Sequence, residues 1–441
     1  MKQRWTPVLG GTSSDLASQA VVDIAEALAP LKPTDKPTAG EITSIELATP
    51  GLLDGDAGIA IFYHYLKRSV PGNHIADATQ SYLASSIEAL ESQQTTPTLY
   101  DGFVGVAWAA NHLVQRGESV QGVDPIEEID RVVYDWLAQS TSPIPFDLLS
   151  GIVGAGVYAL SRFPSSQAVA TLSCAVGLLT RMATPQQVGV SWFTGPSHIS
   201  PKGRVKLPNG VFNLGIPHGV AGVIAFLACV ARLGIERSAT ERLVEQAVAW
   251  ILTQERPSPS WLLSFPSVVT PDGQRLDSRL SWCYGDLSIA SALLLAANLL
   301  DRKDLGERAI EIGLRLASAN IEGSMAFRDP CVCHGTAGVA HMFARLAQRT
   351  DEDRFRIAAR RWFERTLAVR QPGKAFAGFP TWQPDGFAPE RGILTGAAGV
   401  GLALLAATTS CSPDWDAVLL LSSPELNETF MSSAGISNPR N

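Results

Sequence analysis

The segment His218-Gly-Val-Ala-Gly-Val-Ile-Ala-Phe-Leu-Ala-Cys-Val230 contains two glycines three positions apart, Gly219 and Gly222, and continues as a run that is apolar nearly all round. A helix that is apolar on every side must be surrounded by other helices. The paired small residues lie on one face at the start of this helix, where they permit neighbouring backbones to approach closely. The segment therefore predicts an inner helix of a larger helical assembly.

The same pattern of paired small residues before an apolar run occurs seven times along the chain. The first glycines of the seven repeats are Gly55, Gly102, Gly151, Gly219, Gly285, Gly335 and Gly396. Intervals of 47 to 68 residues separate them, which is enough for two helices and their connections. Intervening segments such as Glu241 to Gln254 and Asp353 to Val369 carry charges on one face and apolar residues at helical spacing, which predicts outer helices. In repeat five, Ser288 replaces the second glycine.

Seven repeats of this kind predict an all-α fold, an α/α toroid of seven inner and seven outer helices. An open α-solenoid is the structural alternative. We expect a single domain over residues 1–441, with a loop insertion at about 193–215, where glycine and proline are dense. The insertion precedes the fourth inner helix, so it lies at the same rim as the glycine loops. It is expected to be a lid, a peptide-binding edge or a plain surface loop.

The composition is that of a globular protein without a strongly charged surface. Apolar residues make up 46% of the chain and charged residues 17%, with a formal net charge of -7 and a pI near 5.6. No basic stripe indicates nucleic acid as the main partner. The N-terminus lacks an unbroken apolar stretch of signal-peptide length, and the longest apolar run, Leu287 to Leu300, is too short for the roughly 20 residues of a membrane helix. We therefore expect a cytoplasmic protein without a membrane-spanning segment.

Two positions of the repeat concentrate polar and sulfur-containing side chains. The residues directly before the first glycines all carry a hydrogen-bonding group: Asp54, Asp101, Ser150, His218, Tyr284, His334 and Thr395. One position earlier, cysteine occurs in repeats five and six alone, as Cys283 and Cys333. Equivalent positions in adjacent repeats should be neighbours in space. The alignment therefore predicts that Cys283, Cys333 and His334 converge.

Two thiolates and an imidazole suit Zn²⁺, and an open fourth position is typical of a catalytic zinc. We predict one zinc ion per chain, held by Cys283, Cys333 and His334. The alternative is that these are buried cysteines and a capping histidine. Cys331 is a reserve candidate, because it precedes Cys333 by two residues but lies outside the aligned position. Cys174 and Cys229 lie in apolar helical stretches and are expected to be core residues.

Three further polar residues are placed to reach the same cavity, namely His218, Asp147 and Arg279. His218 occupies in repeat four the place that a predicted zinc ligand occupies in repeat six. Each has a structural alternative: His218 as a satisfied core residue, Asp147 as a helix cap and Arg279 as half of a surface ion pair. Asp54 and Asp101 are expected to be helix caps.

The motifs Ser281-Trp-Cys-Tyr-Gly285, Cys333-His-Gly335 and Pro217-His-Gly219 resemble, in order and spacing, those of the class I lanthipeptide cyclases, the LanC family. The resemblance spans the seven repeats and implies an α/α toroid with zinc near its central opening. It implies the following zinc ligands and active-site residues: Cys283, Cys333 and His334 for the metal, and Asp147, His218 and Arg279 for catalysis.

The resemblance also implies a reaction. A zinc-bound cysteine thiolate of a dehydrated precursor peptide would add to dehydroalanine or dehydrobutyrine and close a thioether ring. His218 and Arg279 are the candidates for protonating and stabilising the resulting enolate, and Asp147 is the candidate for orienting His218 or relaying a proton. The resemblance further suggests a dehydratase and an exporter as partners, and hence peripheral association with a membrane complex.

Two other functions fit parts of the sequence. A non-catalytic LanC-like scaffold protein would hold zinc and glutathione or a partner without closing rings. A glycosidase on a related toroid needs two carboxylates about 5 to 10 Å apart, and Asp54 and Asp101 are the rim pair available. An assay with a dehydrated, cysteine-containing precursor peptide separates these functions, because only a cyclase consumes thiols without changing the substrate mass.

Overall fold

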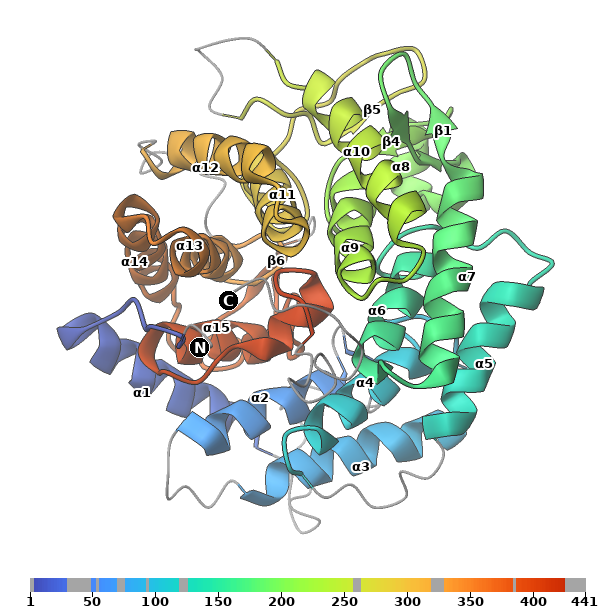
Figure 1. The fold of residues 1–441 in the computed structure, drawn as a ribbon. Coiled ribbons are helices and arrows are strands. Elements are labelled where there is room, and N and C mark those ends of the chain that lie inside the picture. Colours follow the sequence, from blue (N-terminus) through green and yellow to red (C-terminus); the bar gives the residue numbers. More distant parts are fainter. Residues whose placement is uncertain are drawn as a thin grey trace.

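The structure is a computed structural model that describes residues 4–29, 49–52, 55–69, 76–92, 95–118, 126–256, 263–318, 329–383 and 386–424. In these residues, helices form two concentric rings (Figure 1). The inner ring consists of α2 (Asp56–Ser69), α4 (Phe103–Val114), α6 (Ile152–Arg162), α9 (Val220–Arg232), α11 (Asp286–Leu300), α13 (Thr336–Thr350) and α15 (Ala397–Thr408). The outer ring consists of α1 (Gly11–Ala27), α3 (Ala76–Ser92), α5 (Ile126–Gln139), α7 (Ser166–Met182), α10 (Arg237–Thr253), α12 (Lys303–Ala317) and α14 (Asp353–Ala368). The predicted all-α toroid is confirmed.

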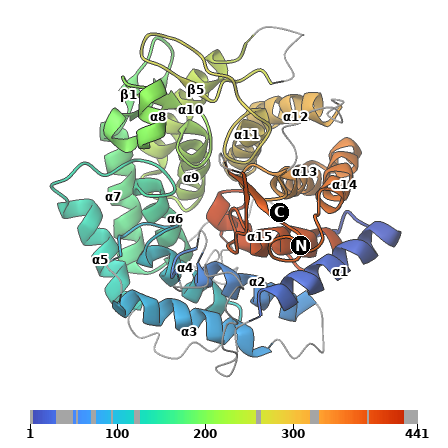
Figure 2. The same cartoon turned by 180° about the vertical axis from the view of Figure 1, so that it is seen from behind.

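The inner ring is closed. Each inner helix contacts the next one, and the last, α15, contacts the first, α2. The N-terminal helix α1 packs against α15, so the first helix of the chain completes the outer ring beside the last inner helix (Figure 2). An open solenoid would keep its first and last inner helices apart, and this alternative is therefore wrong.

Both glycines of a repeat lie where a side chain does not fit. A Cβ atom at Gly102 would come within 1.8 Å of the carbonyl oxygen of Thr96, and one at Gly105 within 2.0 Å of that of Leu99. The Thr96 carbonyl also accepts a hydrogen bond of 3.1 Å from the backbone N–H of Phe103, the first residue of α4. The same six-residue offset recurs in most other repeats. Glycine is therefore required mainly by the loop that folds back on each helix start, and in some repeats also by a side chain from the loop of the adjacent repeat.

Repeat five tolerates its serine. Ser288 is buried, and its Oγ accepts a hydrogen bond of 3.2 Å from the backbone N–H of Ile216 in the loop of repeat four. The Ser288 hydroxyl therefore links repeats four and five, whose inner helices α9 and α11 remain in contact. Gly285, in the same repeat, has a φ of +91°, in the left-handed region that favours glycine.

The longest apolar run of the sequence forms the inner helix α11, which is buried along most of its length. Over the ranges that the structure describes, neither this helix nor any other combines the length and the apolar character needed to cross a membrane.

Backbone hydrogen bonds join successive loops along one rim of the toroid. The N–H of Leu52 donates to the carbonyl of Tyr100 at 2.8 Å, across repeats one and two. The N–H of Cys283 donates to the carbonyl of Cys333 at 3.3 Å, and the N–H of Cys333 donates to that of Leu394 at 2.9 Å. Equivalent loop positions of neighbouring repeats therefore lie side by side.

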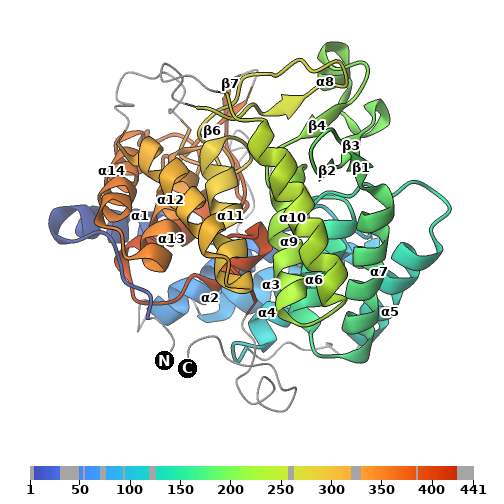
Figure 3. The same ribbon diagram turned by 45° about the horizontal axis from the view of Figure 1, so that its top comes forward.

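Short strands lie at one end of the rings (Figure 3). The segment 193–215 contains β3 (Phe193–Thr194), the 3₁₀ helix η2 (Pro196–His198), α8 (Pro201–Lys206) and β4 (Val211–Asn213). Strand β4 pairs antiparallel with β3 and with β5 (Val268–Val269). Two further antiparallel pairs are formed by β1 (Thr184–Pro185) with β2 (Val190–Ser191) and by β6 (Thr381–Gln383) with β7 (Gly386–Ala388).

The middle of the rings is filled by the 3₁₀ helix η3 (Asp414–Leu419) (Figure 1). Tyr100 of repeat two donates a hydrogen bond from its hydroxyl to the carbonyl of Val418 at 3.1 Å. Trp282 of repeat five donates from Nε1 to the carbonyl of Leu419 at 3.0 Å. Residues from distant repeats thus hold one segment at the centre.

A buried ionic cluster secures this central segment. Asp416 of η3 is fully buried, accepts from Nε2 of His341 at 2.7 Å and pairs with Arg345 through both carboxylate oxygens. Burial alone would raise the pKa of Asp416, but the charge of Arg345 and the hydrogen bond from His341 hold it well below its usual range. The carboxylate is therefore ionised inside the protein.

Candidate metal centre and active site

The predicted zinc ligands lie in adjacent loops at the rim. Cys283 precedes α11, and Cys333 and His334 precede α13. The backbone N–H of Cys283 donates to the carbonyl of Cys333 at 3.3 Å, and Cys283 is buried whereas Cys333 is partly exposed. His334 is close enough to Cys283 for its charge to lower the pKa of that thiol. The loops that carry the three predicted ligands are therefore adjacent, but among the described residues their donor atoms do not form a group within 4.8 Å of one another.

The surroundings of Cys283 favour its thiolate. A hydrogen bond from the Cys333 thiol lowers the pKa of Cys283 more than burial raises it. The guanidinium of Arg279 adds to this effect, with Nη2 lying 3.5 Å from Sγ of Cys283, as does the Ser281 hydroxyl at 3.3 Å. The pKa of Cys333 is raised by the same hydrogen bond, which it donates, and by burial. Thiolate is the form of cysteine that binds metals.

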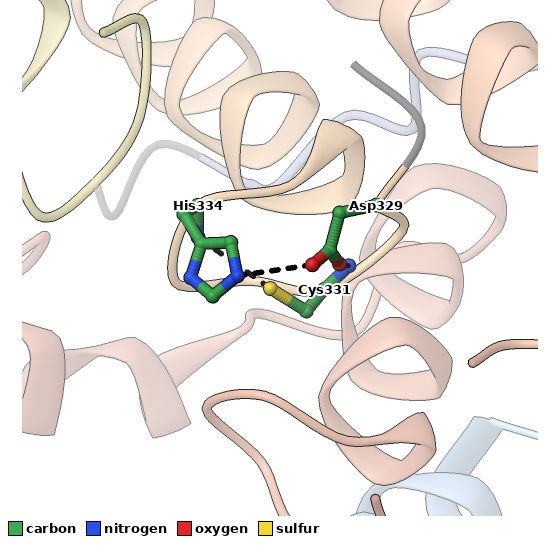
Figure 4. Close-up of side chains that lie close together, drawn as sticks. All are labelled: Asp329, Cys331 and His334. Carbon is green, nitrogen blue, oxygen red and sulfur yellow. Dashed lines mark hydrogen bonds and ion pairs between the residues drawn. The ribbon is translucent and has the colours of Figure 1, made fainter. Parts of the chain in front are cut away.

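A second group of donor atoms surrounds His334 (Figure 4). Oδ2 of Asp329 lies 2.9 Å from Nε2 of His334, but the alignment is not that of a hydrogen bond, so this buried nitrogen has no hydrogen-bond partner. Sγ of Cys331 accepts a hydrogen bond of 3.5 Å from the backbone N–H of His334. The donor atoms of Asp329, Cys331 and His334 lie within 4.8 Å of one another, which is compatible with one metal ion such as zinc.

This second group shares one residue with the predicted ligand set. It includes the reserve candidate Cys331 in place of Cys333, and it adds Asp329. Burial and the neighbouring Asp329 carboxylate raise the pKa of Cys331 well above its usual range, so its thiol stays protonated. The pKa of Cys333 is also raised well above its usual range, so the direction of these shifts does not separate Cys331 from Cys333 as a ligand.

Asp329 is the functional candidate that the sequence analysis missed. Its Oδ1 accepts a hydrogen bond of 2.8 Å from the backbone N–H of Cys331, and its Oδ2 accepts one of 2.9 Å from that of Trp382 in β6. A signal for it exists in the repeat, because Asp329 lies six residues before Gly335, as Arg279 lies six residues before Gly285. Aligning the residues six positions before the first glycines of the repeats would have selected Asp329.

His218 and Asp147 form a direct pair. Nδ1 of His218 lies 2.7 Å from Oδ2 of Asp147, and 39% of the histidine side chain is exposed, so His218 is not a core residue. Oδ1 of Asp147 accepts a hydrogen bond of 2.8 Å from the backbone N–H of Ser150, so one carboxylate oxygen stabilises its own loop. Burial alone would lower the pKa of His218, but the hydrogen bond and charge of Asp147, with a contribution from Cys283, raise it.

Arg279 faces the cysteine pair. Besides its contact with Cys283, its guanidinium carbon lies 5.8 Å from the centre of the Tyr284 ring, whose hydroxyl accepts a hydrogen bond of 3.4 Å from Asn213. These contacts differ from the surface ion pair that was the structural alternative. Arg279 thus places a positive charge beside the thiols.

The other cysteines and carboxylates considered in the sequence are Cys174, Cys229, Asp101 and Asp54. Cys229 is a buried core residue of α9, and Cys174 is partly buried against the core in α7. The N-cap of α4 is Gly102, so the expectation that Asp101 caps this helix is wrong. Asp54, the other member of the carboxylate pair, lies outside the described residues.

The chain matches the family model of the lanthionine synthetase C-like proteins over residues 47–420. It therefore belongs to this family, as the sequence motifs indicated. Among solved structures it is similar to nisin cyclase, with a TM-score of 0.71, 20% sequence identity, and coverage of 85% of this chain and 93% of the other. This likeness confirms the toroidal fold.

Two other solved structures show weaker likeness. The GH76A alpha-1,6-mannanase from Salegentibacter sp. HEL1_6 matches with a TM-score of 0.43 and 14% identity, covering 90% of this chain and 98% of that chain. A sugar epimerase from a ruminal bacterium matches with a TM-score of 0.43 and 12% identity, covering 81% and 87%.

Proposed function

We propose that this protein is a zinc-dependent cyclase that forms lanthionine and methyllanthionine rings. It would add cysteine thiols to dehydroalanine or dehydrobutyrine within a dehydrated precursor peptide. The observation that carries the proposal is the backbone hydrogen bond from Cys283 to Cys333, which joins the two cysteine loops next to His334 in a chain of the lanthionine synthetase C-like family. The pair of His218 and Asp147 lies within electrostatic reach of Cys283 and supplies acid–base groups.

We propose Cys283, Cys333 and His334 as the ligands of one zinc ion per chain. Two thiols and an imidazole are donors that zinc prefers. Both oxygens of Asp329 already accept backbone hydrogen bonds, which argues against Asp329 as a ligand. When bound, zinc would stabilise the substrate cysteine as a thiolate near neutral pH.

The roles of the other residues follow from the bonds that change. A carbon–sulfur bond forms at the β-carbon, the double-bond electrons pass to an enolate, and the α-carbon takes up a proton. Asp147 holds Nδ1 of His218, which leaves Nε2 to carry that proton. Arg279 is positioned to stabilise the enolate oxygen by its charge. The thiol proton lost and the α-proton gained balance, so the peptide mass does not change.

The test is an assay with a dehydrated, cysteine-containing precursor peptide. Alkylation followed by mass spectrometry counts free thiols and detects any change of mass. We expect the zinc-loaded protein and a Cys174→Ser control to consume thiols at constant peptide mass. Retained zinc and unchanged thiols would instead identify the alternative, a zinc- and glutathione-binding scaffold protein.

The proposed reaction also constrains the protein's partners. Dehydroalanine and dehydrobutyrine arise by loss of water from serine and threonine, so a dehydratase must act before this protein. We propose that both act in the cytoplasm and that an exporter removes the product, with the cyclase peripherally associated at the membrane. Co-purification of the three proteins tests this arrangement.

A further inference from the structure

We infer that Asp329 is a positioning residue, which holds the His334 ring so that Nδ1, and not Nε2, faces the metal. The inference rests on the proposed function, because it concerns the same ligand. Nε2 of His334 lies 2.9 Å from Oδ2 of Asp329, and the other ring nitrogen points away from this carboxylate (Figure 4). Metal-binding histidines commonly donate their second ring N–H to a carboxylate, which fixes the tautomer and the ring orientation.

The carboxylate of Asp329 is itself fixed from two sides. The backbone N–H of Cys331, in its own loop, binds Oδ1, and the backbone N–H of Trp382, in strand β6, binds Oδ2. Only 6% of the Asp329 side chain is exposed. Turning the carboxylate toward a metal would leave a buried N–H unpaired, which is unfavourable. The hairpin of β6 and β7 thereby helps to set the orientation of a metal ligand.

The contact between Asp329 and His334 is close but incompletely aligned. Nε2 of His334 is buried and lacks a hydrogen-bond partner, although Oδ2 lies at hydrogen-bond distance. A small rotation of the imidazole would place its N–H on the carboxylate, and a ligand at Nδ1 would hold the ring in that orientation. Metal binding at Nδ1 and the hydrogen bond at Nε2 should therefore strengthen each other.

The competing arrangement is direct binding of the metal by Asp329, Cys331 and Nε2 of His334, whose donor atoms lie within 4.8 Å of one another. In that arrangement the proton of the ring would be on Nδ1, and Cys331 would be a ligand. The two arrangements thus differ in the tautomer of His334 and in the effect of replacing Cys331.

The tautomer can be measured on the intact protein. Long-range ¹H–¹⁵N correlation spectra of the zinc-loaded chain, labelled with ¹⁵N-histidine, report which nitrogen of each ring carries a proton. The chain has seven histidines, and the signal of His334 is assigned by its loss in His334→Gln. We expect a proton on Nε2 and zinc on Nδ1. The opposite tautomer would overturn the inference, and this measurement does not depend on the folding of an Asp329 variant.

Zinc affinity provides the second readout. Asp329→Asn should lose about 10- to 100-fold in zinc affinity, measured by competition with a chelator. The matched control, Cys331→Ser, should keep the wild-type affinity and the thiolate-to-metal absorption band of the cobalt-substituted protein. Melting temperatures of the metal-free variants separate a change at the metal centre from general loss of stability.

The outcomes distinguish this inference from the proposed function. If the wild-type chain binds no zinc, the proposed function itself fails. If the chain binds zinc and cyclises peptide but Asp329→Asn keeps full affinity, only the positioning role of Asp329 fails. Loss of the thiolate band in Cys331→Ser would favour direct binding by Asp329, Cys331 and His334.

Discussion

Nδ1 of His218 lies 2.7 Å from Oδ2 of Asp147, and the two residues belong to the loops before α9 and α6. The pair therefore spans two repeats, and packing of the inner ring brings the residues together across 71 positions of sequence. Because Asp147 holds Nδ1, the nitrogen that remains for proton transfer is Nε2.

The first prediction is that His218→Asn keeps its zinc and loses its activity. Loss of a positioned general acid or base costs about 10² to 10⁴ in rate. Zinc content, melting temperature and cyclisation rate should be measured on the same preparation. Loss of zinc in proportion to activity, or full retention of activity, would show that His218 has no acid–base role.

The second prediction concerns pH. Asp147 raises the pKa of His218, so the imidazolium persists to higher pH than in an ordinary histidine, and an activity that needs it declines as pH rises through this pKa. In Asp147→Asn the alkaline limb of the kcat/KM profile should move to lower pH. Ser150→Ala is the matched control, because it removes a hydroxyl contact to Asp147 and keeps the carboxylate. If the alkaline limb of the kcat/KM profile does not move in Asp147→Asn, the acid–base role assigned to the pair of His218 and Asp147 is contradicted.

The third prediction separates metal binding from folding. Cys283→Ala and Cys333→Ala should each lose zinc and cyclisation while keeping most of the helical circular dichroism, since the toroid core does not depend on these rim thiols. Cys174→Ser, in the outer helix α7, should keep its zinc. Complete unfolding of the rim variants would make the zinc structural, and retention of zinc in both would remove these cysteines from the ligand set.

The fourth prediction concerns the centre of the toroid. Asp416→Asn leaves Arg345 buried without its counter-charge, which should lower the free energy of unfolding by about 3–5 kcal/mol. Asp277→Asn, whose side chain is 80% exposed in its pair with Arg256, should cost about 1 kcal/mol or less. Chemical denaturation of both variants measures the difference, and equal stabilities would rule out a structural role for the cluster.

The stability that Asp416 contributes should also depend on pH. Its pKa in the folded protein is depressed, so the contribution is complete above the usual pKa of an aspartate, near 3.9, and is lost as pH falls toward the depressed value. The difference between wild type and Asp416→Asn should therefore be constant around neutral pH and shrink in strong acid.

The inner ring was predictable because local backbone geometry requires glycine at the starts of its helices. A side chain at Gly102 or Gly105 would collide with the carbonyl oxygen six residues earlier, and this constraint recurs in most other repeats. The convergence of Cys283 and Cys333 was predictable for the same reason, since equivalent loop positions are hydrogen-bonded neighbours along the rim.

Features that depend on distant contacts were not predictable in this way. Helix α1 lacks a pair of glycines three positions apart, and its place beside α15 follows from closure of the ring. The orientation of Asp329 is set by the backbone of Trp382, 53 residues later, and that of η3 by Tyr100 and Trp282 from distant repeats. Each of these bonds has a backbone group as one partner, and a backbone group leaves no trace in residue type.

The most direct test of the proposed cyclase activity is to run the reaction in D₂O and to count deuterium and thiols in the same peptide product. Addition of a thiol to a dehydrated residue requires protonation of the α-carbon, so each ring should carry one non-exchangeable deuterium for each thiol lost, and only when zinc-loaded protein is present. Disulfide formation would instead consume two thiols without fixing deuterium on carbon. Thiol loss without deuterium, or the same rate without the protein, would contradict a thioether cyclase.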